Sequence, residues 1–170
     1  MSSYRDTVPD LERGGTVDKF FLPARYTGSA MDVRFKRLDP QVPVPEYKTA
    51  GAVGFDIAVR EGGTLAAGER RLFKTGLVVK VPDGYGLFLF PRSSNAKKGV
   101  TFANAVGVLD QDFCGPEDEI RLALHNVGSE PYTVLPYERI GQGVFLPVLK
   151  PTFVEGAMEA NNRGGFGTTG

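Results

Sequence analysis

The sequence predicts an all-β fold, a jelly-roll or distorted β-barrel subunit with one short helix. Glycine and proline are frequent and scattered, with 22 glycines and 12 prolines in 170 residues, which is typical of short strands joined by turns. Several windows alternate between apolar and polar residues, as half-buried strands do, and no window keeps a helical period. A sandwich or a barrel buries one face of such strands.

The expected elements follow one another along the chain. The first strand covers residues 31–38, and its apolar face would carry Met31, Val33 and Phe35. Further strands are expected at residues 71–81, 85–90, 120–125 and 143–148, and the turn Pro82-Asp83-Gly84 joins the first two of them. The one expected helix is short, beginning near Ser93 and ending by Gly99.

Composition also divides the chain into parts. Residues 1–30 show weak periodicity and read as an N-terminal extension, without the apolar run of a signal peptide. Residues 31–160 carry the strand patterns and form the β domain. Residues 161–170 are polar and rich in glycine, and we interpret them as a C-terminal arm.

The charge and the residue composition limit the kinds of partner and metal site that the chain can have. The chain has 20 basic and 20 acidic side chains, so we expect neither long nucleic acid nor a membrane as a partner. Cys114 and His125 are the only residues of their types, which excludes an internal disulfide, a cysteine zinc cage and a multi-histidine site. A metal would be a hard cation held by oxygen, such as Mg²⁺. The single thiol suits a cytoplasmic location, or the host cytoplasm if the chain is viral.

Residues 91–99 are the first segment that could carry chemistry. A serine before a helical turn can cap it, and the exposed amides of a helix start bind phosphate. Arg92 adds a fork of charged donors beside Ser93 and Ser94. Taken alone, the segment favours a plain capped helix with solvated lysines.

Residues 104–113 are the second segment. Asp110 follows Val108 and Leu109, so we expect it to be partly sheltered from water and able to serve as a general base. The alternative is a β-hairpin in which Asp110 and Asp112 only stabilise the turn. The acidic run 117–119 that follows is expected to be a solvated loop.

The C-terminal arm is the third segment. Its glycines let backbone amides approach an anion, and Arg163, Thr168 and Thr169 can donate to phosphate. Phe166 has no local packing partner and could stack on a base. The alternative is a disordered terminus. Two weaker segments also carry charged residues. The segment around Asp56 suits an acid at a strand edge, and residues 138–142 suit a charged strand start after a turn at Pro136.

The order of these segments resembles the five motifs of the trimeric dUTPase family. The motifs match, in order, Gly54-Phe55-Asp56-Ile57, residues 91–99, residues 104–115, Glu138-Arg139-Ile140-Gly141-Gln142, and residues 163–170. The resemblance covers about residues 31–170. It implies a jelly-roll homotrimer with active sites shared between subunits, which hydrolyses dUTP to dUMP and pyrophosphate by water attack on the α-phosphate. Such an enzyme keeps uracil out of DNA and supplies dUMP for thymidylate synthesis.

The resemblance also implies a role for each matched residue. Asp110 would activate the water, and Asp56 would position Mg²⁺ through water. The substrate would be bound by the side chains or backbone of Arg92, Ser93, Ser94, Asn104, Gly107, Val108, Leu109, Phe113, Gln142, Arg163, Phe166, Gly167, Thr168 and Thr169. The chain has Phe113 where the family usually has tyrosine, Ser94 for glycine and Gly141 for alanine, and none of these changes removes an expected catalytic group.

Alternatives on the same fold remain. dCTP deaminases resemble the chain at residues 92–94, but they use a glutamate where this chain has Ala123, which cannot take a proton. A regulatory binding module could use the first thirty residues and the acidic loop, although all five motifs are intact. A structural jelly roll of the viral-capsid kind would need neither Asp110 nor the C-terminal arm.

Overall fold

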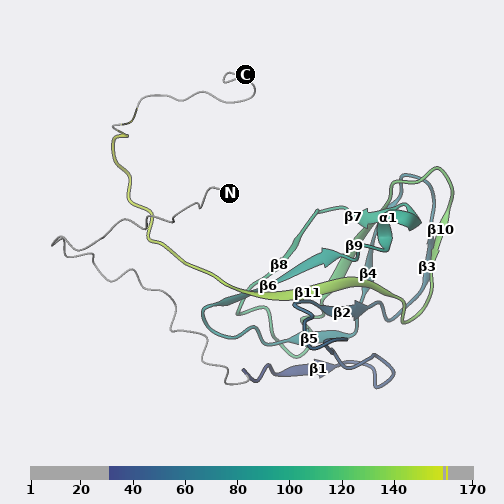
Figure 1. Ribbon diagram of the computed structural model, residues 1–170, viewed down its shortest axis with the longest axis horizontal. Coiled ribbons are helices and arrows are strands. Elements are labelled where there is room, and N and C mark those ends of the chain that lie inside the picture. The colour runs from purple at the N-terminus through teal and green to yellow at the C-terminus, as the bar shows by residue number, and fades with distance from the viewer. Residues whose placement is uncertain (1–30, 159, 161–170) are drawn as a thin grey trace, which may run out of the picture. The chain divides into compact units, whose positions relative to one another are not determined.

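The computed structural model describes residues 31–158 and residue 160. The elements of this part of the chain are, in order, β1 (Phe35–Arg37), β2 (Phe55–Ala58), β3 (Gly63–Leu65), β4 (Arg70–Lys74), β5 (Leu77–Val79), β6 (Tyr85–Pro91), α1 (Asn95–Lys98), β7 (Val100–Phe102), β8 (Gly107–Leu109), β9 (Arg121–Asn126), β10 (Tyr132–Val134) and β11 (Arg139–Pro147). The all-β class and the single short helix agree with the prediction (Figure 1). Among the described residues, no helix is long and apolar enough to cross a membrane.

Antiparallel pairing joins strands that are far apart in the sequence. The larger sheet has the strand order β2-β11-β6-β8, and a three-stranded sheet has the order β4-β9-β7. Two smaller sheets pair β1 with β5 and β3 with β10. The long strand β11 therefore lies beside β2 and β6, which brings residues from three separate parts of the sequence onto one sheet (Figure 1).

The core lies where the two larger sheets face each other. Fully buried side chains come from both, including Ile57, Leu87, Leu122, Leu124 and Ile140. A Cβ atom built on Gly141 of β11 would lie only 2.9 Å from the Leu122 side chain on β9, so glycine allows this close approach. The predicted alternation at residues 120–125 is confirmed, because Leu122 and Leu124 point into this core.

The predicted strand at residues 71–81 is wrong as a single element. It is divided into β4, which pairs with β9, and β5, which pairs with β1. The division falls at Gly76, whose φ of 70° is unfavourable for other residues. Buried Thr75 donates its hydroxyl to the Ile120 carbonyl at 2.8 Å and fixes the bend. Apolar residues stand on both sides of the bend, at Leu72 and Phe73 and again at residues 77–79, which is why the pattern did not reveal it.

The first predicted strand is shorter and more exposed than expected. Only residues 35–37 form β1, and Phe35 and Met31 are 43% and 44% exposed. Val33 alone of the three apolar residues packs against the core. The physical reason is that β1 belongs to a two-stranded sheet, so its second face has no layer to pack against among the described residues.

The predicted helix and turn positions are confirmed. α1 occupies residues 95–98 and ends at Gly99, whose φ is 66°. The turn before β6 is closed by a bond from the Tyr85 N–H to the Pro82 carbonyl at 3.1 Å. The predicted serine cap is wrong, because the Ser94 side chain makes no capping hydrogen bond. Consecutive backbone turn bonds, such as that from the Ala96 N–H to the Ser93 carbonyl, begin the helix instead.

Candidate functional site

A polar cluster forms where β2, the end of β6 and β11 lie side by side. Gln142 of β11 lies opposite Asp56 of β2 on one side and opposite Phe90 of β6 on the other. The Asp56 carboxylate forms an ion pair with Arg92, with 2.9 Å between Nε and Oδ1, and accepts a hydrogen bond from Arg139 Nη1 at 3.1 Å. The Gln142 amide donates to the Pro91 carbonyl at 3.2 Å. Three of the predicted site residues, Asp56, Arg92 and Gln142, are therefore brought together.

Arg139 belongs to this cluster, and the sequence reasoning did not assign it a role. Its guanidinium shares Asp56 with Arg92, while its carbonyl accepts from Arg92 Nη1 at 2.9 Å. The register of β2 and β11 produces this contact through an irregularity between Arg139 and Gly141. The only sequence signal was an arginine in the fourth motif, which a charged strand start explains equally well. Two guanidinium groups at one carboxylate leave donors that can face an anion.

An ion pair holds α1 against the start of β11. Lys98 donates to Glu138, and the Tyr132 hydroxyl donates to the same carboxylate oxygen at 2.6 Å. Burial alone would raise the pKa of Glu138, but the bonds from Lys98, Tyr132 and the Leu135 N–H outweigh it and hold the pKa below its ordinary value. The bond to Glu138 raises the pKa of Lys98.

Asn95 adds a second link, because its side-chain amide donates to the Ile140 carbonyl at 2.8 Å. The helix is thus fixed to the strand that carries Gln142.

The two predicted serines at the start of this helix differ in exposure. Ser93 is exposed, so its hydroxyl is open to a ligand, whereas the backbone amides of Asn95 and Ala96 donate to backbone carbonyls. The Ser94 hydroxyl is buried and has no hydrogen-bond partner within the described chain. The contact between Ser94 and a phosphate group therefore stays a prediction.

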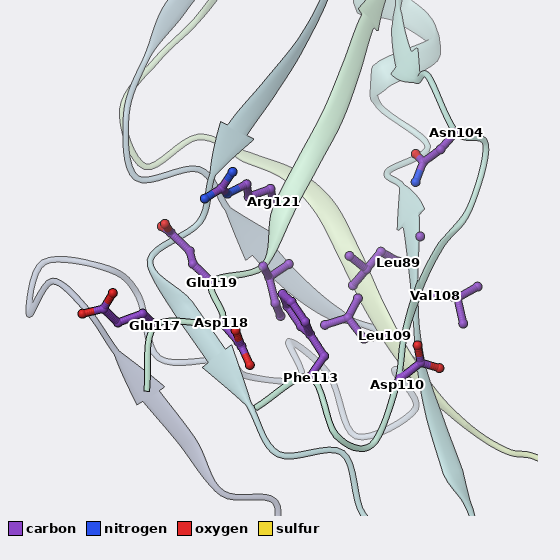
Figure 2. A pocket seen from close by; sticks show the side chains of 12 residues that line it. Leu89, Asn104, Val108, Leu109, Asp110, Phe113, Glu117, Asp118, Glu119 and Arg121 are labelled. Atoms are coloured by element: carbon purple, nitrogen blue, oxygen red, sulfur yellow. The ribbon is translucent and has the colours of Figure 1, made fainter. Parts of the chain in front are cut away.

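A pocket of 520 Å³ lies at the other group of predicted residues (Figure 2). Such a volume fits a small organic ligand. The lining includes all the predicted residues of the third motif, namely Asn104, Gly107, Val108, Leu109, Asp110 and Phe113. In Figure 2, Asn104 and Asp110 lie on one side with Leu109 between them and the Phe113 ring, and Glu119 and Arg121 lie on the opposite side.

Asp110 is exposed, and the prediction that it would be sheltered is wrong for this chain. The strand β8 ends at Leu109, which is buried, and the chain leaves the sheet before Asp110. Leu109 therefore shields the core rather than the carboxylate. A carboxylate at the edge of a pocket can accept a proton from water once a ligand covers it.

The predicted hairpin in residues 104–113 is also different. The strands on either side of Asp110 and Asp112 do not pair with each other, since β8 pairs with β6 and the next strand, β9, pairs with β4 and β7. Asn104 begins a tight turn in which the Val106 N–H bonds to its carbonyl at 2.6 Å, and Ala105 has a φ of 60°. This turn crosses from one sheet to the other and places the Asn104 side chain at the pocket.

The acidic run after the pocket is only partly the solvated loop that was expected. Glu117 is exposed, but Glu119 is buried. The Glu119 carboxylate accepts from the Gly76 N–H at 2.6 Å and lies 4.0 Å from the Arg60 guanidinium. Its role is to fix the bend between β4 and β5, a long-range contact that no local pattern reveals.

The remaining predicted residues, Arg163, Phe166, Gly167, Thr168 and Thr169, lie outside the described residues. Among those described, the polar cluster and the pocket remain separate, because the lining of the pocket includes neither Arg92 nor Gln142. One chain therefore presents a pocket with a carboxylate and an amide, and a separate cluster of guanidinium and hydroxyl donors.

The side chains of the polar cluster and the pocket suit a metal ion that enters together with a ligand better than a metal ion that the protein binds by itself. In residues 31–158 and 160, no group of three or more carboxylate, histidine or cysteine side chains could hold a metal by itself. One Asp56 oxygen is paired with Arg92 and the other with Arg139. A carboxylate has about four lone-pair positions, so Asp56 can still accept from metal-bound water.

The described chain is an all-β protein with two arginines on one carboxylate and a carboxylate-edged pocket, groups whose chemistry suits a small anionic ligand. The family model for dUTPase matches residues 40–170. The chain is 42% identical to the deoxyuridine 5'-triphosphate nucleotidohydrolase of Methylocella silvestris, over 82% of this chain and 92% of that protein. It is 41% identical to the protein of the same name from Chlamydia pneumoniae, over 80% and 97%.

Similarity to a solved structure supports the same family. A crystal structure of dUTPase from Streptococcus mutans aligns with a TM-score of 0.63 and 34% identity, covering 72% of this chain and 98% of that one. The chain belongs to the dUTPase family, and its fold is the family's jelly roll.

Proposed function

We propose that this chain hydrolyses dUTP to dUMP and pyrophosphate by water attack on the α-phosphate, with Asp110 as the general base. Family membership and the shared name of the relatives support dUTP hydrolysis. The observation that carries the residue assignment is the pocket in which Asp110, Asn104 and Phe113 lie together. An ionised carboxylate beside a bound triphosphate can accept the proton of the attacking water.

Each wall of the pocket suits one part of the nucleotide. The Asn104 amide can both donate and accept, as the edge of uracil requires. The Phe113 ring, which is 41% exposed, offers an apolar face to the deoxyribose and leaves no partner for a ribose 2′-hydroxyl. Arg92, Ser93 and Gln142 then bind phosphate oxygens. Hydrolysis of a phosphoanhydride depends mainly on this positioning and on neutralisation of charge.

Magnesium fits this assignment as a companion of the triphosphate. When bound, it supplies positive charge that neutralises the phosphate oxygens. Asp56 is the residue that would hold it, through water, while its direct bonds orient Arg92 and Arg139. The arm residues Arg163, Phe166, Gly167, Thr168 and Thr169 are proposed to close over the nucleotide and exclude water.

The separation of the pocket from the polar cluster supports a homotrimer with shared sites. On the large sheet, Val108, Phe88 and Val144 lie in one cross-strand row, and Leu146 continues their face along β11. Val108 is 62% exposed and Leu146 is 41% exposed, so the residues that the structure describes leave this apolar row open. Packing of three such rows would bury them and bring the cluster of one subunit to the pocket of another.

A deaminase on the same fold is disfavoured at a particular position. Ala123 lies on β9 where a deaminase would need a carboxylate, and a methyl group cannot move a proton. No observation favours a purely regulatory module either. A cytoplasmic location, or the host cytoplasm if the chain is viral, stays a prediction from the sequence.

The test is release of pyrophosphate from dUTP, dTTP, dCTP and UTP with Mg²⁺, at equal nucleotide concentrations. We expect rapid release from dUTP and much slower release from the other three nucleotides. Ammonia release from dCTP would support the deaminase instead. Equal hydrolysis of all four nucleotides would contradict the proposed reading of uracil and deoxyribose.

A further inference from the structure

Gln111, the residue after the proposed general base Asp110, makes several hydrogen bonds that the proposed function does not explain. Its side-chain Nε2 donates to the carbonyls of Tyr85 and Pro82 at 3.0 and 3.3 Å. Its Oε1 accepts from Lys150 Nζ at 3.0 Å. Its backbone carbonyl accepts from Lys80 Nζ at 2.9 Å. One half-buried residue therefore joins the pocket segment to the β5–β6 turn and to the chain that follows β11.

The position of Gln111 in the sheet explains these bonds. The ladder between β6 and β8 ends at the pair Leu87 and Leu109. If the register continued, Gln111 would lie opposite Tyr85, and the Tyr85 carbonyl would accept from its backbone. The strand has ended by then, and the Gln111 side-chain amide donates to that carbonyl instead. Asp110 lies between the last ladder pair and this side-chain anchor.

We propose that Gln111 is a positioning residue that fixes the Asp110 turn for catalysis, an inference that rests on the proposed function. Asp110 is exposed and has no side-chain hydrogen bond among the described residues, so its direction depends on the backbone on either side. Leu109 holds one side through the core, and Gln111 holds the other through the β5–β6 turn. Loss of that anchor changes where the carboxylate points without emptying the pocket.

The chain offers matched variants that separate the bonds of the amide. Gln111→Glu keeps the size and the acceptor for Lys150 but replaces the donor to the two carbonyls with a second acceptor. Lys150→Met removes the Lys150 bond and leaves both donor bonds in place. Gln111→Leu removes all three side-chain bonds at similar volume. Each is made in the full chain and compared with the wild type.

We expect Gln111→Glu and Gln111→Leu to lower kcat for dUTP by about 10- to 100-fold, the cost of a displacement of about 1 Å at a reacting group. KM, the Kd of a non-hydrolysable dUTP analogue, the oligomeric mass and Tm should stay near the Lys150→Met values. Lys150→Met should keep the wild-type kcat. A fall in kcat at constant analogue affinity marks positioning, because a merely structural role would change binding and Tm as well.

Wild-type kcat in Gln111→Glu overturns the inference, and so does a loss of activity accompanied by an equal loss of analogue binding. If Gln111→Leu fails to fold, Gln111→Glu alone decides the question. Failure of the proposed function is a different result, because the wild-type chain would then release no pyrophosphate from dUTP in the same assay.

Discussion

The Arg92 guanidinium contacts the Asp56 carboxylate, with 2.9 Å between Nε and Oδ1. Asp56 lies on β2 and Arg92 directly follows β6, and the two residues meet because β11 pairs with both strands. The ion pair fixes the direction of Arg92 toward the proposed phosphate site, and a preorganised guanidinium loses less entropy on binding an anion.

Asp56→Asn should raise the Mg²⁺ concentration that gives half-maximal hydrolysis of dUTP, because an amide attracts metal-bound water more weakly than a carboxylate. A Mg²⁺ titration of the initial rate measures this. Glu130→Gln, which neutralises an exposed loop carboxylate, is the matched control and should leave the titration unchanged. An unchanged Mg²⁺ requirement in Asp56→Asn would restrict Asp56 to its arginine contacts.

The chain should be a trimer in solution, with three times the 18.4 kDa mass of one chain. Leu146→Asp should reduce the trimer to smaller species, because it places a charge in the open apolar row. Val127→Asp, at a residue that is 57% exposed in a loop, should keep the trimer. Light scattering that shows a monomer fully active on dUTP would exclude the shared-site account.

Glu138→Gln should lower the free energy of unfolding at neutral pH by about 1–3 kcal/mol, because it weakens bonds to a half-buried carboxylate. The pKa of Glu138 is below 4.5 in the folded protein, so the unfolded chain takes up the proton first as pH falls. The wild type therefore loses this stability as pH falls below about 4.5, and its advantage over Glu138→Gln should shrink there.

Denaturant unfolding of both proteins between pH 3 and pH 8 checks this. The pKa of Lys98 is raised above its ordinary value of 10.5, so Lys98 keeps its contribution up to strongly alkaline pH. A difference between the two proteins that stays constant down to pH 3 would contradict the assignment of the low pKa to Glu138.

Deletion of residues 163–170 should greatly reduce kcat/KM for dUTP while Tm and oligomeric mass stay unchanged, because a glycine-rich arm contributes little to the core. Phe166→Ala should weaken nucleotide binding by about 1–3 kcal/mol, as loss of a base–aromatic contact does. Arg163→Ala should weaken binding of the triphosphate more than binding of dUMP. Wild-type kinetics after the deletion would mean that the arm has no part in the reaction.

Local patterns were sufficient for the fold class, because strand alternation and turn chemistry depend on neighbouring residues. Leu122 and Leu124 show this, as does the turn before Tyr85. Long-range contacts were not predictable. Thr75 and Gly76 bend a seemingly continuous strand because of a bond to Ile120 and the close approach of Val42.

The candidate site shows the same division. Ordered motifs predicted which residues line the pocket, and Asn104, Asp110 and Phe113 do so. The exposure of Asp110 was not predictable, since it depends on where β8 leaves β6. The ion pair of Arg139 with Asp56 depends on the pairing of β2 with β11, which a single sequence does not contain.

The central claim is that Asp110 activates the attacking water on bound dUTP. Its most direct test is the turnover of Asp110→Asn with dUTP, measured beside the Kd of the same protein for a non-hydrolysable dUTP analogue. The amide cannot accept the proton, so kcat should fall by about 10²- to 10⁴-fold while the Kd stays close to that of the wild type. A near-normal kcat in Asp110→Asn would contradict the account.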